Sequence, residues 1–152
     1  MIHYSTVVSI RRPPSDVLAA LLDPEKYPKW TEMVDTRFEG GGLPRVGTRG
    51  EFRLPGGPLK GRYAMEILAL EPDRRLDIRI DGSGLRWMSR ITLEPEAGGT
   101  RMTYAGDISL LGWRRILEPL MVREAQAGEA KEAERFKALL EAEVAPAAAS
   151  VG

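Results

Sequence analysis

The segment PPSDVLAALLDPEKYPKW, residues 13–30, contains two short helix patterns separated by proline. The first pattern has an apolar face at a spacing of three to four residues, formed by Val17, Leu18, Leu21 and Leu22. Pro24 cannot donate a backbone hydrogen bond and restricts the residue before it. The first helix is therefore predicted to end before Pro24, within residues 13–23.

The second pattern starts with Asp23, Pro24 and Glu25, which suit the first turn of a helix. Aspartate can cap the free N–H groups, proline fits the first helical position, and glutamate interacts well with the positive end of the helix dipole. Pro28 follows so closely that a long helix is excluded. We expect a very short second helix that runs to about Met33.

On both sides of this segment, apolar and polar residues alternate, which is typical of half-buried strands. The predicted strands are residues 2–10, 34–40, 48–54, 61–70, 76–81, 85–94 and 100–110. Short turns such as PGGP join most of them, which favours an antiparallel sheet. Residues 113–145 have helical periodicity, so the order predicts one α+β domain over residues 1–145, with a frayed tail at 146–152.

The composition excludes several function classes. The 152 residues contain 22 basic and 22 acidic side chains, so no net field attracts nucleic acid. No cysteine is present, which excludes disulfides and thiolate chemistry, and the single histidine argues against a metal site. There is no apolar run of about 20 residues and no signal-peptide pattern. We expect a cytoplasmic protein without stable membrane insertion, metal or cofactor.

The order of elements, with its particular residues, resembles the START-like or SRPBCC superfamily. It is most similar to the polyketide cyclase/dehydrase and lipid transport proteins. Besides residues 13–30, the resemblance rests on VGTRGEF (46–52), ILALEPDRRLDIRI (67–80), LEPEAGGTRMTY (93–104) and LEPLM (117–121). It implies a helix-grip fold, in which a curved seven-stranded antiparallel sheet wraps around the long C-terminal helix and encloses a cavity, closed at one end by the two short helices.

The implied cavity would be lined by the apolar faces of the strands, the lid segment and the long helix. The predicted ligand-binding residues are Trp30, Met33, Phe52, Leu54, Tyr63, Met65, Ile78, Trp87, Tyr104, Leu117, Met121 and Gly128. Side chains that simply fill a core would show the same pattern, and Trp30 could equally plug one end of it. A glycine within a helix costs about 1 kcal/mol relative to alanine. Space for a ligand, close backbone packing and plain tolerance all explain Gly128.

Few ionisable residues are candidates for chemistry. Strand alternation turns Glu51 and Arg53 outward if their neighbour Phe52 faces inward. By the same alternation, His3 and Asp107 are expected on the solvent side of their strands.

Glu132 falls near the apolar stripe of the long helix, four residues before Phe136. Burial would raise its pKa, whereas a place at the edge of the stripe would let it pair with Arg135.

The leading hypothesis is non-catalytic binding or transport of a hydrophobic or aromatic small molecule, such as a lipid, an isoprenoid quinone or a polyketide-like compound. The first alternative is a polyketide cyclase or dehydratase that uses tyrosine, carboxylate and arginine groups in the same cavity. The second alternative is a protein-interaction or co-chaperone module, as found among proteins of this fold. The sequence leaves the catalytic residues unassigned, and it leaves both a monomer and a homodimer open.

Overall fold

The computed structural model describes residues 1–143 of the chain. The first strand, β1 (Ile2–Ile10), is followed by the short helices α1 (Pro14–Leu21) and α2 (Tyr27–Trp30). Six strands come next: β2 (Val34–Phe38), β3 (Arg49–Leu54), β4 (Gly61–Glu71), β5 (Arg75–Gly82), β6 (Leu85–Glu96) and β7 (Gly99–Leu110). The chain then forms the 3₁₀ helix η1 (Gly112–Leu117) and the long helix α3 (Glu118–Ala142). This order confirms the predicted α+β helix-grip fold.

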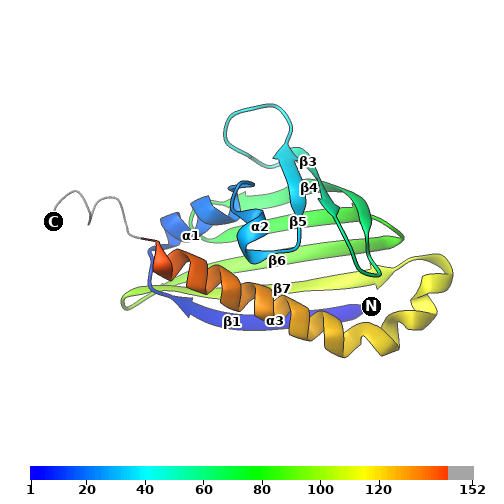
Figure 1. The fold of residues 1–152 in the computed structure, drawn as a ribbon. Coiled ribbons are helices and arrows are strands. Elements are labelled where there is room, and N and C mark those ends of the chain that lie inside the picture. The colour runs from blue at the N-terminus through cyan, green and yellow to red at the C-terminus, as the bar shows by residue number, and fades with distance from the viewer. Residues whose placement is uncertain (144–152) are drawn as a thin grey trace.

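The seven strands form one antiparallel sheet in the order β1-β7-β6-β5-β4-β3-β2. The register shifts between Val34 and Arg37 in β2, and again between Ile67 and Ala69 in β4. Irregularities of this kind bend a strand and increase the local twist. The sheet curves around α3, which crosses its concave side (Figure 1).

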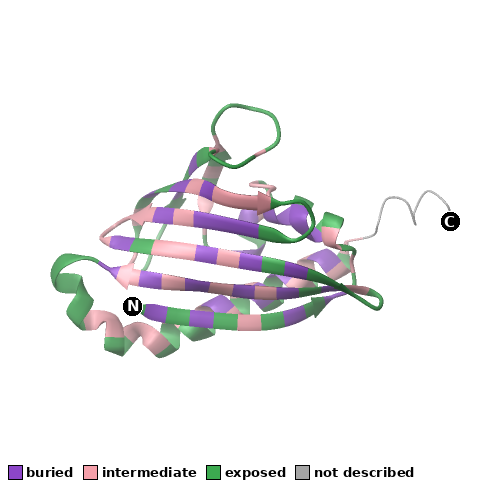
Figure 2. Ribbon diagram, turned by 180° about the vertical axis from the view of Figure 1, so that it is seen from behind, coloured by how far each residue is buried: buried purple, intermediate pink, exposed green. Residues whose placement is uncertain are grey.

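Helix α3 packs mainly along β1, at one edge of the sheet. Its buried residues Ala133, Phe136 and Leu140 lie at helical spacing and join the core. Seen from the other side of the sheet, buried and exposed residues alternate along the strands (Figure 2). Since α3 lies along β1, the concave surface of β3 and β4 at the opposite end of the sheet is left for other contacts.

The segment between the first two helices accommodates its two prolines without breaking a helix. The Asp23 side chain accepts a hydrogen bond from the Glu25 N–H at 3.0 Å, which makes a tight turn rather than a helix cap. Helix α2 begins only at Tyr27, so Pro28 lies in the first turn, where its missing N–H breaks no helical bond.

Helix α2 is shorter than predicted and ends at Trp30 instead of near Met33. Thr31 adopts an extended conformation, and its hydroxyl donates to the Tyr27 carbonyl at 2.8 Å and accepts from the Met33 N–H at 3.0 Å. These side-chain bonds replace the helical bonds that would have continued the helix.

The helical periodicity of residues 113–145 corresponds to two elements, η1 and α3. Pro119 lies in the first turn of α3, where its missing N–H breaks no helical bond. The described part of α3 ends at Ala142. The predicted frayed tail at 146–152 lies outside the described residues. Within residues 1–143, no helix combines the length and apolarity needed to cross a membrane.

Candidate functional site

The concave side of the sheet contains two neighbouring hollows. The larger, which we call the outer groove, has a volume of about 270 Å³ and opens between α3, the strands and the segment after α2. Its lining residues are Glu32, Met33, Phe52, Leu54, Pro58, Leu59, Tyr63, Leu85, Trp87, Ile108, Met121, Glu124, Ala125, Gly128, Glu129, Glu132 and Arg135. The smaller, the inner pocket, has a volume of about 40 Å³. It is lined by Leu21, Tyr27, Trp30, Thr31, Met33, Met65, Leu76, Ile78, Ile80, Trp87, Ser89, Ile91 and Tyr104.

Met33 and Trp87 line both hollows. Methionine has an unbranched and adaptable side chain, so a change in its rotamer is an inexpensive way to alter the wall between the two hollows. The outer groove and the inner pocket therefore share a wall, and we treat them as one candidate site.

One wall of the outer groove is aromatic and held in place. The rings of Phe52 and Tyr63 stack at a centroid distance of 5.1 Å with only 7° between their planes. The Tyr63 hydroxyl donates to the Leu59 carbonyl at 2.5 Å, so it is already satisfied by the protein. This wall offers a flat apolar surface rather than a free hydroxyl group.

Trp87 is fixed by a buried tyrosine. Its indole N–H donates to the Tyr4 hydroxyl at 2.8 Å. Gly106 makes this arrangement possible, because a Cβ at that position would lie 2.5 Å from the Tyr4 hydroxyl and 2.4 Å from the Met88 carbonyl. Burial raises the pKa of Tyr4, so its hydroxyl stays neutral.

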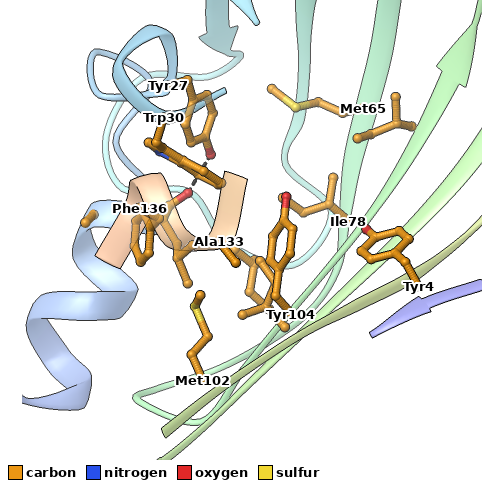
Figure 3. Packing of buried hydrophobic residues seen from close by; sticks show 14 of the residues in the cluster. Tyr4, Tyr27, Trp30, Met65, Ile78, Met102, Tyr104, Ala133 and Phe136 are labelled. Atoms are coloured by element: carbon orange, nitrogen blue, oxygen red, sulfur yellow. Dashed lines mark hydrogen bonds between the residues drawn. The ribbon is translucent and has the colours of Figure 1, made fainter. Parts of the chain in front are cut away.

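Trp30 belongs to an aromatic cluster beneath α3 (Figure 3). Its ring centroid lies 4.8 Å from that of Phe136 and 6.2 Å from that of Tyr104. Only 5% of Trp30 is exposed, and its indole N–H has no hydrogen-bond partner among residues 1–143. Tyr27, which packs edge-on against Trp30, is also buried and donates its hydroxyl to the Leu21 carbonyl at 2.5 Å. Trp30 thus lines the inner pocket and at the same time fills that end of the core.

Two carboxyl groups from adjacent turns of α3, those of Glu129 and Glu132, line the outer groove. Glu132 accepts a hydrogen bond from the Tyr104 hydroxyl at 3.0 Å. Glu129 is only 8% exposed, and its Oε2 atom has no hydrogen-bond partner in the described part of the chain. Burial raises the pKa of both groups, and for Glu129 the neighbouring Glu132 carboxylate raises it further. We call Glu129 and Glu132 the carboxyl pair.

The sequence interpretation considered Glu132 but missed Glu129. The spacing could have indicated that Glu129 is buried. It precedes Ala133 by four residues and Phe136 by seven, on the apolar stripe that continues to Leu140. Glu132 is partly buried and bonded to Tyr104, and the salt bridges of residues 1–143 include none between Glu132 and Arg135.

The structure distributes the predicted ligand-binding residues between the two hollows. The inner pocket is lined by Trp30, Met33, Met65, Ile78, Trp87 and Tyr104. The outer groove is lined by Met33, Phe52, Leu54, Tyr63, Trp87, Met121 and Gly128. Leu117 lines neither hollow and instead packs, partly buried, against the edge of the core.

The remaining ionisable candidates lie away from both hollows. Arg37 donates to Glu51 at 2.7 Å, and Arg53 donates to Asp35 at 2.9 Å, on the outward face that strand alternation predicts. His3 pairs with Asp107, which Arg90 also contacts.

Comparison with known proteins agrees with this architecture. The family described as polyketide cyclase / dehydrase and lipid transport matches residues 1–141. The sequence matches no curated protein at a significant level.

Several solved structures share the fold. Protein MLL2253 from Mesorhizobium loti is 21% identical with a TM-score of 0.71, and the match covers 93% of this chain and 99% of that one. TTHA0849 from Thermus thermophilus is 17% identical with a TM-score of 0.74, and the match covers 91% and 96% of the two chains. DynU16, a putative protein in the dynemicin biosynthetic locus, is 21% identical with a TM-score of 0.69, and the match covers 93% of this chain and 48% of DynU16. The match over residues 1–141 establishes that the chain belongs to the polyketide cyclase / dehydrase and lipid transport family.

Proposed function

We propose that this protein binds a hydrophobic or aromatic small molecule in the outer groove and does so without catalysis. The observation that carries the proposal is the groove itself, a hollow of about 270 Å³ whose walls are largely apolar and aromatic and include a few polar groups. This combination is the usual composition of a small-molecule site. Lipids, isoprenoid quinones and polyketide-like compounds all have the required apolar body, and a cytoplasmic location fits the absence of cysteine.

The apolar body of the ligand would lie on the stacked rings of Phe52 and Tyr63, opposite Met121 of α3. Movement of Met33 would extend the space toward the inner pocket. Burial of ~300 Å² of ligand surface contributes roughly 7 kcal/mol before association costs. Once those costs are included, we expect dissociation constants on the order of micromolar.

A second candidate function is proton-transfer catalysis of the cyclase or dehydratase type. The observation that favours it is the carboxyl pair, since a buried carboxyl group with a raised pKa is suited to general acid or base chemistry. Catalysis predicts that Glu129→Gln abolishes turnover of a polyketide-like substrate while leaving its binding intact. Pure binding predicts no turnover in either protein.

The binding proposal is tested by filling the groove. A Cβ atom at Gly128 would meet nothing within 4 Å, and Gly128 lines the groove, so Gly128→Leu places a large side chain in open space. Leucine is also a better helix former than glycine by nearly 1 kcal/mol, so the variant should fold. We expect at least about a tenfold loss of affinity for hydrophobic fluorescent dyes, which corresponds to about 1.4 kcal/mol.

Ala127→Leu is the matched control, because Ala127 is the neighbouring residue of α3 and is exposed. It should leave dye affinity unchanged. Equal affinity in all three proteins would contradict binding in the groove. Native mass spectrometry of the purified protein provides a separate test, in which a bound apolar compound should be lost from Gly128→Leu and retained in Ala127→Leu.

A further inference from the structure

We propose that the outer groove selects an apolar or aromatic amine, whose ammonium group pairs with Glu129 and Glu132. This inference rests on the proposed binding function and narrows its ligand class. It is carried by the charges that line the groove and by the unpartnered carboxyl oxygen of Glu129.

The groove is acidic although the chain as a whole is neutral. Among its lining residues, four carry carboxyl groups and one carries a guanidinium: Glu32, Glu124, Glu129, Glu132 and Arg135. The whole sequence has 22 acidic and 22 basic side chains, so this excess is local. A fatty acid or another anionic amphiphile would meet like charge here, whereas a cation would meet opposite charge.

Glu129 provides an independent observation. The side chain is 8% exposed, it lines the groove, and Oε2 makes no hydrogen bond within residues 1–143. Leaving a buried carboxyl oxygen unpaired is costly, so a ligand that donates to it gains more than it would at an exposed group. The salt bridges of the described residues include none to either member of the carboxyl pair.

The groups that face the carboxyl pair come from four parts of the chain. Tyr4 and His3 lie on β1, and both border a third hollow, between β1 and α3, that Glu129 also lines. Tyr104 lies on β7 and donates to Glu132. Arg135 on α3 lowers the pKa of Glu132 by its positive charge, whereas Glu32, which follows α2, raises it. Glu124 on α3 completes the acidic lining of the groove.

An ammonium group suits this arrangement because it offers three donors and no acceptor. Two donors can reach the carboxyl pair, while the attached apolar body rests on the aromatic wall. A neutral alcohol offers one donor and would leave more of the carboxyl oxygens unpaired. A cation beside aromatic faces gains a further attraction from the ring quadrupoles.

The proposal has a defined proton balance. Burial and mutual repulsion favour a shared proton on the carboxyl pair when no ligand is bound. When a protonated amine enters, that proton leaves to solvent, so ammonium binding should strengthen as pH rises through the pKa of the carboxyl pair. Binding of a neutral alcohol should release no proton and should not strengthen in this way.

The test is calorimetry with three probes of one shape: 2-naphthylmethylamine, 2-naphthylmethanol and 2-naphthoate. At pH 8 we expect the amine to bind at least about tenfold more tightly than the alcohol, and the carboxylate to bind most weakly. The preference for amine over alcohol should fall between pH 8 and pH 5. At pH 7, amine binding should release protons, detected as a dependence of the observed heat on the ionisation enthalpy of the buffer.

Glu129→Gln should remove the preference for the amine while leaving alcohol affinity within about threefold. Glu134→Gln is the matched control, because Glu134 is an exposed glutamate of α3 that does not line the groove, and it should retain the preference. The pH dependence of the unmodified protein tests the proposal independently of either variant.

The outcomes separate the two proposals. If the alcohol binds in the groove and the amine binds no more tightly, or if the carboxylate binds best, the amine proposal is wrong and the binding function stands. If none of the three probes binds and the hydrophobic dyes also fail to bind, both proposals are wrong.

Discussion

Trp30 lies where α2, α3 and β7 meet, and the rings around it leave little room for movement. Its contacts with Phe136 and Tyr104 place it in the core, although one side borders the inner pocket. A gating side chain would have to move out of its position at a small cost in free energy. The packing of Trp30 therefore favours a structural plug.

We predict that Trp30→Ala lowers the free energy of unfolding by ~3–5 kcal/mol, as is usual when a large aromatic side chain is removed from a core. Urea denaturation measures the change. Trp113→Ala is the control, because Trp113 is 70% exposed and its loss should change stability by less than about 0.5 kcal/mol. A Trp30→Ala protein of normal stability with altered dye uptake would instead show that Trp30 is a gate.

At the scale of single residues, strand alternation was informative and helix periodicity was less so. Alternation is strict, so the outward direction of Glu51 and Arg53 followed from the direction of Phe52. On α3, glutamate occurs on several faces, and burial depends on where the helix crosses β1. Glu129 could not be separated from its exposed neighbours until that crossing was known.

At the scale of elements, α3 carries an unfavourable buried group in the middle of an otherwise well-packed stripe. The raised pKa of Glu129 means that the folded protein retains a proton that the unfolded chain releases near its ordinary pKa of 4.5. Between these two values the folded state binds more protons, so stability falls as pH rises. The cost is absent below the ordinary pKa and complete above the raised one.

We predict that Glu129→Gln is more stable than the parent protein at pH 8 and that the difference disappears near pH 4. Each unit by which the pKa is raised corresponds to about 1.4 kcal/mol at high pH. Urea denaturation across this pH range measures the effect. Glu134→Gln, on the exposed face of α3, should reproduce the pH profile of the parent. A constant difference between Glu129→Gln and the parent at every pH would argue against a buried, protonated Glu129.

The predicted boundaries of the strands agree with the structure, whereas side-chain hydrogen bonds shifted the end of a helix. The strands of the sheet lie within a few residues of their predicted positions, because turns with glycine and proline limit them. Helix α2 ended early through the Thr31 hydroxyl, and a single threonine gives no clear stop signal in a sequence. The division between η1 and α3 likewise depends on how the chain leaves β7.

At the scale of the whole molecule, two carboxylates fasten the ends of α3 to the sheet. Glu118, at its start, pairs with the N-terminal ammonium group and accepts from the Leu110 N–H at 2.8 Å. Glu141, near its end, accepts from the Arg11 N–H at 2.9 Å. These bonds lower the pKa of both carboxyl groups. A lowered pKa contributes stability above the unfolded-state value of about 4.5, and this stability is lost as pH falls through the folded-state value.

We predict that acid loosens α3 from the sheet before the sheet itself unfolds. Hydrogen exchange should show protection factors in α3 falling between about pH 5 and pH 3 while those in β6 and β7 persist. The double variant Glu118→Gln, Glu141→Gln should have low protection in α3 already at pH 7 and should respond less to acid. Simultaneous loss of protection in the helix and the sheet would contradict this prediction.

The overall architecture could be predicted because the order of elements and the antiparallel turns restrict the topology strongly. The site could be predicted only as a set of inward positions. Whether those positions leave a hollow depends on how closely α3 approaches each strand. In a close-packed interior, a difference of a few methylene groups in side-chain volume is enough to fill or open such a space. The groove lies between α3 and strands with which the helix makes few direct contacts, and residues of both line it.

The three tryptophans differ in burial, so their intrinsic fluorescence reports on different parts of the protein. Trp30 is buried, Trp87 is partly buried in the wall shared by the two hollows, and Trp113 is exposed. Iodide in solution should quench the emission of Trp113 most strongly and that of Trp30 least. In a Trp113→Phe protein, a compound that occupies the groove should shift the emission of Trp87 and leave that of Trp30 nearly constant. Occupancy of the groove can therefore be followed by fluorescence without attaching a label.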